Sequence, residues 1–264
     1  MTASKALESF LFPFLNTSVG RKTVMSLTGL GAIGFLIFHL LGNAVVFQGD
    51  WNFNVYADML HALPFLRLAE VALAVIFISH LAFGIILTFA NLAARPMPYA
   101  VKLSAGRQTF ASTTMIYTGL VILAYMLFHV WTMSISPSES VKAFDRVKTE
   151  LTTPWCAAFY LVALTALGIH LSHGASSALL SLGLRHQLHD PWVDTFGKIA
   201  AALLAAGFGV IVLWFAVWGG PVAADKKVVS TGVLSTEAGT GLKHSVHSTQ
   251  YSVQDQAAKR FYTP

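Results

Sequence analysis

Hydrophobic and polar positions divide the chain into long apolar runs separated by short polar connections. Five intervals contain no Asp, Glu, Lys or Arg, namely residues 23–49, 71–94, 108–138, 151–184 and 199–224. A helix needs about 20 apolar residues to cross the hydrocarbon core, and lipid tolerates no unpaired backbone groups. None of the runs alternates with period two, which disfavours a β-barrel. The pattern predicts an all-α integral membrane protein in which residues 22–218 form a bundle of five transmembrane helices.

The two ends of the chain differ from this bundle. The first apolar run follows Arg21 and Lys22, exceeds a signal-peptide core in length and has no cleavage site close behind, so we expect it to be retained. In the N-terminal segment, residues 1–21, the stretch Phe10–Leu15 is interrupted by Pro13 and is too short to cross, so we expect it at the membrane interface or on a partner. Residues 219–264 are polar and need no fold of their own. We find no internal repeat.

The distribution of positive charge predicts the orientation. Eight Lys and Arg residues lie in the N-terminal segment and the second and fourth connections, against four in the first and third. The positive-inside rule then places the N-terminus in the cytoplasm and, after five spans, the C-terminal tail outside it. The net charge is +5, but the basic residues are scattered rather than gathered on one face. We therefore expect membrane lipid, and no nucleic acid, as a partner.

Composition narrows the chemistry. The chain is 55% hydrophobic and 11% charged, with a mean hydropathy of +0.63, which excludes a disordered protein and disfavours a water-soluble enzyme. Cys156 is the single cysteine, so the chain cannot supply a disulfide framework, a cysteine-rich zinc site or the ligands of an iron–sulfur cluster. Any redox chemistry therefore requires a cofactor held by other residues.

Asp, Glu, Lys and Arg are absent from the predicted spans, but several histidines lie well inside them. Each of the first four spans contains at least one, and the set is His39, His80, His129, His170 and His173. Ionisable groups inside a membrane are costly and are functional candidates by default. With no intramembrane carboxylate to complete a proton relay, we interpret the set as cofactor ligands rather than as packing residues.

Their depths predict two pairs. Two histidines lie close before acidic residues that mark the outer side: His39 is 11 residues before Asp50, and His129 is 10 before Glu139. The other two lie 15 residues before arginines that mark the cytoplasmic side: His80 before Arg95, and His170 before Arg185. His80 is also only 10 residues after Glu70, which taken alone would place it near the outer side. However, a helix that begins just after Pro64 carries Arg67 and Glu70 as a mutually neutralising pair in its first turns, so we take the distance to Arg95 as the measure of depth.

Two imidazoles from facing helices at one depth suit a bis-histidine haem, because each neutral ring nitrogen supplies one axial bond. Zinc suits them less, since two histidines leave its tetrahedron half empty. The chain has no CxxCH motif, so we expect non-covalent b-type haem. Glycines on these helices give room for a porphyrin face, or serve ordinary close packing: Gly31, Gly34, Gly42, Gly84, Gly168 and Gly174.

Several segments stand in an order known from one family. They are Ser26–Gly29, Phe35–Asn43, Leu63–Phe65 followed by Glu70, Ile78–Gly84, Phe128–Trp131, and His170–Gly174 leading to Leu182–Gly183. Over about residues 20–218 the chain resembles the single-subunit, five-helix, di-haem cytochrome b of bacterial succinate dehydrogenases and fumarate reductases.

The resemblance implies a ligand set. In that family the first four helices each supply one axial ligand, and the first helix pairs with the third and the second with the fourth. His39 and His129 would then hold an outer haem, and His80 and His170 an inner haem. The family's fourth-helix ligand precedes a glycine by four residues, which favours His170 over His173. His173 lies one turn nearer the cytoplasm on nearly the same face, where it could bond a haem propionate or a quinone. An exchanged assignment, with His173 as the ligand in place of His170, stays open.

The resemblance also implies a role. The chain would be the membrane anchor and electron conduit of a complex in the bacterial cell membrane, and a flavoprotein and an iron–sulfur subunit would perform the dicarboxylate chemistry on the cytoplasmic face. Electrons would pass between the iron–sulfur subunit, two haem b groups and a membrane quinone, for which the di-haem pattern suggests menaquinone. The chain alone would not catalyse the dicarboxylate step. A higher oligomer of the heterotrimer stays an open expectation.

Other residues are weaker candidates. Ser26, Arg21 and Arg107 could contact haem propionates, and a plain helix-end serine and positive-inside anchors are the alternatives. His61 and Trp51 in the first outer connection could border a quinone site, or could belong to an interfacial belt.

Two rival functions remain open. One is the di-haem cytochrome b subunit of another membrane oxidoreductase, although such subunits usually place two histidines on one helix. The other is a proton transporter that uses histidines, although no proline breaks the five cores as in transporters with discontinuous helices.

Overall fold

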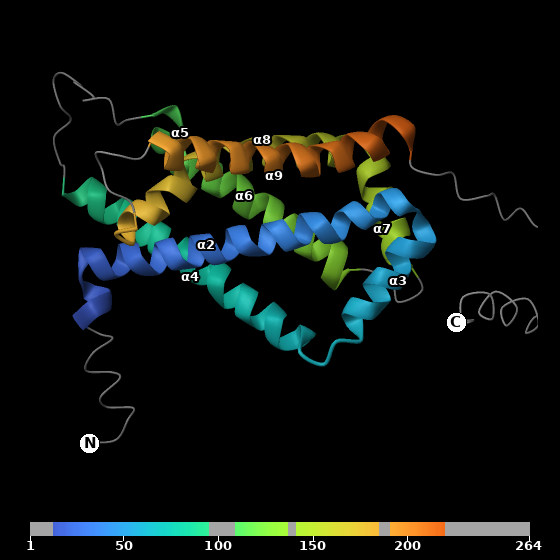
Figure 1. Cartoon of the computed structure of the whole chain (residues 1–264), viewed down its shortest axis with the longest axis horizontal. Helices are drawn as coiled ribbons and strands as arrows, with labels where there is room; N and C mark the ends of the chain where they lie inside the picture. Colours follow the sequence, from blue (N-terminus) through green and yellow to red (C-terminus); the bar gives the residue numbers. More distant parts are fainter. Residues whose placement is uncertain (1–12, 95–108, 137–140, 185–190, 220–264) are drawn as a thin grey trace, which may run out of the picture. The chain divides into compact units, whose positions relative to one another are not determined.

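The computed structural model describes residues 13–94, 109–136, 141–184 and 191–219. Five of its helices are long and apolar enough to cross a membrane. They are α2 (Ser18–Ala44) continued by the 3-10 turn η1 (Val45–Gln48), α4 (Leu66–Ala93), α6 (Met115–Val130) continued by the π-helical turn η2 (Trp131–Ile135), α8 (Pro154–Ser181) and α9 (Pro191–Trp218). No strand occurs in the described residues. The prediction of an all-α membrane protein with five spans is confirmed (Figure 1).

Helices α2, α4 and α9 start earlier than the charge-free intervals indicate, whereas α6 and α8 start a few residues later. The Thr17 hydroxyl accepts a hydrogen bond from the Gly20 N–H at 2.9 Å and starts α2, so Arg21 lies inside its first turns. In α4 the expected neutralising pair forms: Arg67 donates to Glu70 at 2.8 Å. Charged residues near an interface can stay in a membrane helix because their long side chains extend toward water. Intervals that end at every charged residue therefore miss the first turns of such helices.

Two shorter helices, which the sequence reading did not anticipate, lie in the connections that follow α2 and α6. They are α3 (Asp50–His61) and α7 (Ala143–Thr152). Asn54 Oδ1 accepts a hydrogen bond from the Phe144 N–H at 3.0 Å, and the rings of Phe53 and Phe144 meet edge to face at 6.2 Å. Figure 1 shows both helices at the same end of the bundle, which we call the cap end.

The main buried core lies toward this cap end. Phe215 of α9 is completely buried and meets Phe144 of α7 edge to face at 5.7 Å, and Leu151 and Tyr160 belong to the same cluster. Elsewhere burial is sparse: α4 and α6 each bury one residue, Leu87 and Thr118. Membrane helices can expose apolar side chains because lipid solvates them.

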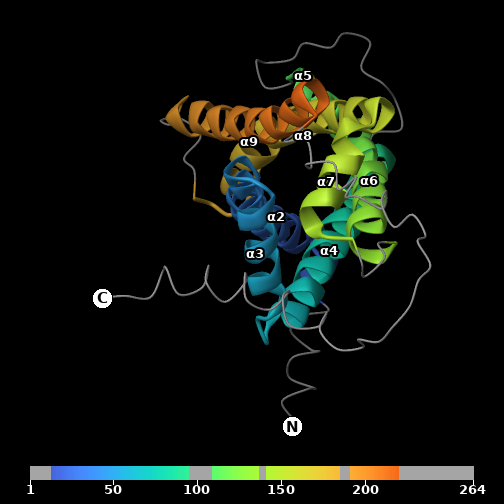
Figure 2. The same cartoon turned by 90° about the vertical axis from the view of Figure 1, so that its right-hand side faces the viewer.

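Viewed along the helices, α2, α4, α6 and α8 surround a common interior, and α9 lies outside them (Figure 2). α2 packs on α4, α6 packs on α8, and α8 also contacts α2. α9 packs along α8 and touches α2. The first four spans therefore form the bundle whose interior carries the predicted histidines, while α9 covers one side of it.

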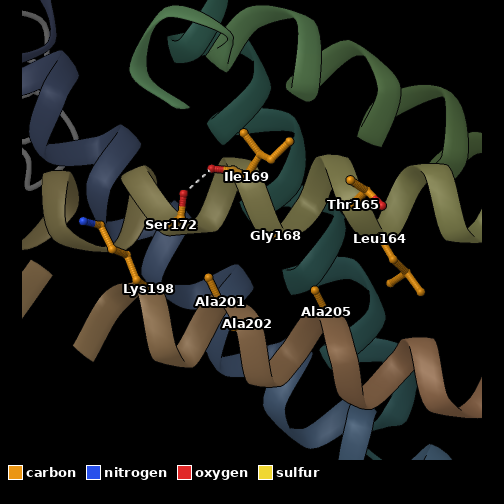
Figure 3. Close-up of a pocket in the computed structure, with 9 residues that line it drawn as sticks. All are labelled: Leu164, Thr165, Gly168, Ile169, Ser172, Lys198, Ala201, Ala202 and Ala205. Carbon is orange, nitrogen blue, oxygen red and sulfur yellow. Dashed lines mark hydrogen bonds between the residues drawn. The ribbon is translucent and has the colours of Figure 1, made fainter. Parts of the chain in front are cut away.

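The α8–α9 contact contains an open groove of about 340 Å³. Small side chains allow the two backbones to approach, since Gly168 faces Ala205 so closely that an added Cβ would lie 3.2 Å from the alanine. The lining residues are drawn in Figure 3: Leu164, Thr165, Gly168, Ile169, Ser172, Lys198, Ala201, Ala202 and Ala205. None of them is a histidine, so the groove is separate from the interior in which the histidines meet.

Candidate cofactor site between facing histidines

The four predicted histidines meet as two pairs across the bundle interior. His39 of α2 and His129 of α6 have ring centroids 6.0 Å apart at an interplanar angle of 79°. His80 of α4 and His170 of α8 have centroids 6.3 Å apart at 70°. We call His39 and His129 the cap-side pair, because both lie near the helix ends from which α3 and α7 follow, and His80 and His170 the central pair.

The two pairs lie at different levels along the helices. Thr28, which contacts His80, stands 11 residues before His39 on α2, and Thr118, which contacts His170, stands 11 residues before His129 on α6. At 1.5 Å per residue this spacing is about 16 Å along the bundle. The depth argument from the charged flanks predicts the same pairing.

Both imidazoles of the central pair are held through Nδ1. The His80 Nδ1–H donates to the Met25 carbonyl at 3.1 Å, with the Thr28 hydroxyl at 3.4 Å. His170 Nδ1 lies 3.1 Å from the Thr118 hydroxyl. The Thr118 hydroxyl itself donates to the Thr114 carbonyl at 3.0 Å, so its oxygen is free to accept from the imidazole.

The cap-side pair has different neighbours. His129 Nδ1 lies 3.1 Å from the Tyr160 hydroxyl of α8, and the Tyr125 ring stacks on His129 at 5.5 Å. His39 stacks on Phe35 at 5.1 Å, and the Asn43 amide nitrogen is 3.4 Å from both of its ring nitrogens. These two neighbours of His39 belong to its own helix.

The geometry of each pair fits two axial ligands on one metal. A metal–imidazole bond of about 2 Å, added to roughly 1 Å from nitrogen to ring centre, puts two coaxial rings about 6 Å apart. The observed 6.0 and 6.3 Å agree with that value. In the described part of the chain, Nε2 of His80, His129 and His170 makes no hydrogen bond, so the nitrogen opposite the held Nδ1 can serve as ligand.

A metal that needs three or more protein ligands fits less well. Within the described ranges, no three His, Cys, Asp or Glu side chains gather in a way that could hold a metal ion. Haem iron needs only two, because the porphyrin supplies the other four nitrogens. The donor set therefore fits the b-type haem predicted from the sequence better than it fits zinc.

The remaining residues predicted to contact a cofactor do not meet in pairs as the four histidines do. His173 is half-buried one turn beyond His170 and makes no ring contact with His80 in the described residues, although Asp194 acts on it electrostatically. Ser26 is buried in α2, and the Arg21 guanidinium donates to the Leu15 carbonyl at 3.0 Å. Arg107 lies outside the described residues.

The proposed quinone-border residues lie on α3. Trp51 is 71% exposed, and His61 is exposed with its Nδ1–H donating to the Ala57 carbonyl at 2.7 Å. Neither contacts the cap-side pair among the described contacts. Their exposure on a cap-end helix agrees equally with an interfacial belt and with a site border, so both interpretations stay predictions.

Three of the six glycines singled out in the sequence lie at close helix contacts, and a Cβ added at Gly174 would lie 3.9 Å from Met115. An added Cβ would meet Tyr56 at Gly42, Ile76 at Gly31, and Ala205 at Gly168, whereas Gly34 and Gly84 face open space. The glycines that touch the histidines are others. A Cβ at Gly29 would lie 3.1 Å from His80 Cε1, and one at Gly119 would lie 3.6 Å from His170 Cε1.

These contacts reveal an internal repeat, and the expectation of none is wrong. Residues 25–29 and 115–119 both read Met-x-x-Thr-Gly, residues 38–39 and 128–129 both read Phe-His, and residues 80–84 and 170–174 both read His-Leu-x-x-Gly. Every match has an offset of 90 residues. The repeat is a sequence signal for Thr28, Thr118, Gly29 and Gly119, which the sequence reading did not single out.

Comparisons with models of protein families, with curated proteins and with solved structures find no match for this chain.

Proposed function

We propose that the chain is a di-haem cytochrome b that anchors a succinate:quinone oxidoreductase in the membrane and conducts electrons between its iron–sulfur subunit and quinone. The observation that carries the proposal is the meeting of two histidine pairs, 6.0 and 6.3 Å apart, inside a bundle of membrane-spanning helices. The family motifs in their expected order support the same function.

The chain's own residues would bind and orient the cofactors. His39 with His129 would hold one haem b iron, and His80 with His170 the other. Tyr160, Thr28 and Thr118 hold Nδ1 of three of these rings, which leaves Nε2 for the metal. Bound haem iron supplies one-electron transfer. The apolar helices keep water and bulk protons away from the pairs.

The resemblance to the anchor family implies the proposed complex, in which a flavoprotein and an iron–sulfur subunit perform the dicarboxylate step. The single cysteine agrees with this division, because one cysteine cannot ligate an iron–sulfur cluster. The positive-inside count favours a cytoplasmic N-terminus, which puts the partners at the end opposite the cap end and the C-terminus outside the cytoplasm. Menaquinone is the proposed quinone, and Trp51 and His61 are candidates to border its site near the cap end.

The decisive experiment is a pyridine haemochrome assay on the purified full-length protein, with protein concentration measured independently. We expect two low-spin b haems per chain. A protein without haem would overturn the proposal and favour a histidine-dependent proton transporter. Purification from native membranes is the second arm: co-purifying flavin and iron–sulfur subunits with succinate-linked quinone reduction support the specific complex. Other redox partners would instead indicate a different di-haem oxidoreductase.

A further inference from the structure

The central pair is surrounded by the same set of contacts in both halves of the 90-residue repeat. In α2 and α4, the Met25 carbonyl, the Thr28 hydroxyl and Gly29 all face the His80 ring. In α6 and α8, the Thr118 hydroxyl bonds His170 Nδ1 at 3.1 Å, and a Cβ at Gly119 would lie 3.6 Å from His170 Cε1. Both threonine–histidine contacts span 52 residues of sequence.

The hydroxyl groups are also oriented alike. Thr28 Oγ1 donates back to the Val24 carbonyl at 2.7 Å or the Met25 carbonyl at 3.0 Å. Thr118 Oγ1 donates to the Thr114 carbonyl at 3.0 Å or the Met115 carbonyl at 3.1 Å, again with an offset of 90. Because the hydroxyl proton is used inside the helix, the oxygen can only accept from the imidazole. A threonine so placed fixes the proton of its histidine on Nδ1.

We propose that Thr28 and Thr118 are equivalent positioning residues, which hold the Nδ1–H tautomer of His80 and His170 so that both Nε2 atoms face one haem iron. The inference rests on the proposed function. The repeated residues lie on α2 and α4 in the first copy and on α6 and α8 in the second, and within each copy the two helices pack on each other. A haem iron held by the central pair would therefore lie between equivalent residues.

The hydrogen bonds have an electronic effect that packing alone does not have. An acceptor on Nδ1–H makes the imidazole a stronger donor to iron and stabilises the oxidised form. Removing the acceptor therefore raises the midpoint potential of that haem. Thr118 is 3.1 Å from His170, whereas Thr28 is 3.4 Å from His80, which keeps the Met25 carbonyl at 3.1 Å. The Thr118 substitution has the larger effect.

Redox titration of purified Thr28→Val and Thr118→Val proteins, followed by optical and EPR spectra, tests this. Valine keeps the shape of threonine and lacks the hydroxyl. We expect the component that His80→Ala removes to shift to higher potential in both variants, more in Thr118→Val and most in the double variant. The other component keeps its potential, and Thr118→Ser restores the wild-type value.

The matched control is Thr88→Val. Thr88 of α4 is half-buried and donates to the Gly84 carbonyl at 2.8 Å, like the two positioning threonines, but it contacts no histidine among the described residues. An equal shift in this control, an equal shift of both components, or a failure of serine to restore the potential would overturn the inference. If the protein binds two haems but neither valine variant changes a midpoint potential, the inference about the threonines is wrong and the proposed function stands. A wild-type chain without haem overturns the proposed function as well.

Discussion

The central and cap-side histidine pairs are built from the same repeat, yet only the central pair has equivalent surroundings on both sides. His80 contacts Thr28 of α2, and His170 contacts Thr118 of α6, at equivalent positions of the repeat. In the cap-side pair, His129 bonds Tyr160 of α8, while His39 is accompanied by Phe35 and Asn43 of its own helix.

The difference has a simple origin in the sequence. The aromatic that stacks on each cap-side histidine is repeated, as Phe35 and Tyr125 at an offset of 90 residues. The hydroxyl partner is not, because the position equivalent to Tyr160 is Glu70, which lies near the start of α4 in an ion pair with Arg67. The repeated histidines therefore have equivalent surroundings at the central pair, where the neighbouring residues are repeated too, and not at the cap-side pair.

Removing ligands is the strongest way to break this comparison. His39→Ala and His129→Ala should each reduce the haem content from two per chain to one, with loss of the same component in a redox titration. His80→Ala and His170→Ala should each remove the other component, because the proposed function assigns the two histidines of each pair to one haem iron.

The control for this series is His173→Ala, which should retain both haems, since its ring does not meet His80 in the described residues. Loss of the same component from His39→Ala and His80→Ala would mean that the pairing is wrong. Loss of a haem from His173→Ala would move the fourth-helix ligand away from His170.

The pairing could be anticipated from the sequence, whereas the residues around it could not. Depth follows from the helical rise and the charged flanks, both of which are local, so His39 and His129 could be matched without a structure. Which face of α2 meets α4 depends on tertiary packing, and Thr28 was missed for that reason. The repeat carried the missing signal, because Met-x-x-Thr-Gly precedes a Phe-His by the same interval in both copies.

The fold shows the same division between local and tertiary information. Five spans follow from apolar length alone. Helices α3 and α7 cannot be predicted in this way, because they are short and lie in polar connections. They are stabilised by tertiary contacts between them, namely the packing of Phe53 on Phe144 and the hydrogen bond of Asn54.

Truncation of a side chain should destabilise the protein more in the core at the cap end than at an exposed position of the same helix. Phe215→Ala at the cap end removes a completely buried ring from the main core and should lower the free energy of unfolding by about 3 kcal/mol, the low end for such truncations, because lipid reduces the transfer contribution. Leu213→Ala on the same helix, 47% exposed, should change it by under about 1 kcal/mol. Unfolding titrations with a denaturing detergent measure both. Equal losses would contradict a core concentrated at the cap end.

A glycine substitution can break the equivalence of the central pair itself. A methyl group at Gly29 lies 3.1 Å from His80 Cε1, so Gly29→Ala should displace the ring and reduce the haem content below two per chain. Gly119→Ala should be tolerated, because its contact with His170 is 3.6 Å, an ordinary separation. Gly34→Ala is the control, since its Cβ meets nothing within 4 Å. The haemochrome assay decides, and loss in all three variants would point to general helix disruption.

The smallest expected effect concerns the Tyr160 hydroxyl, which has no counterpart in the other copy of the repeat. Tyr160→Phe keeps the ring that packs against Tyr125 and Phe128 but removes the oxygen 3.1 Å from His129 Nδ1. If Nε2 of His129 is the ligand, Nδ1 carries the proton and the tyrosine oxygen accepts it, so its loss weakens the imidazole as a donor. The component removed by His129→Ala should then move to higher potential while the central component stays fixed. The control is Tyr117→Phe, on the same helix as His129 and 68% exposed, which should move neither. A shift to lower potential would mean that Tyr160 donates to this histidine, and the ligand nitrogen of His129 would have to be reassigned.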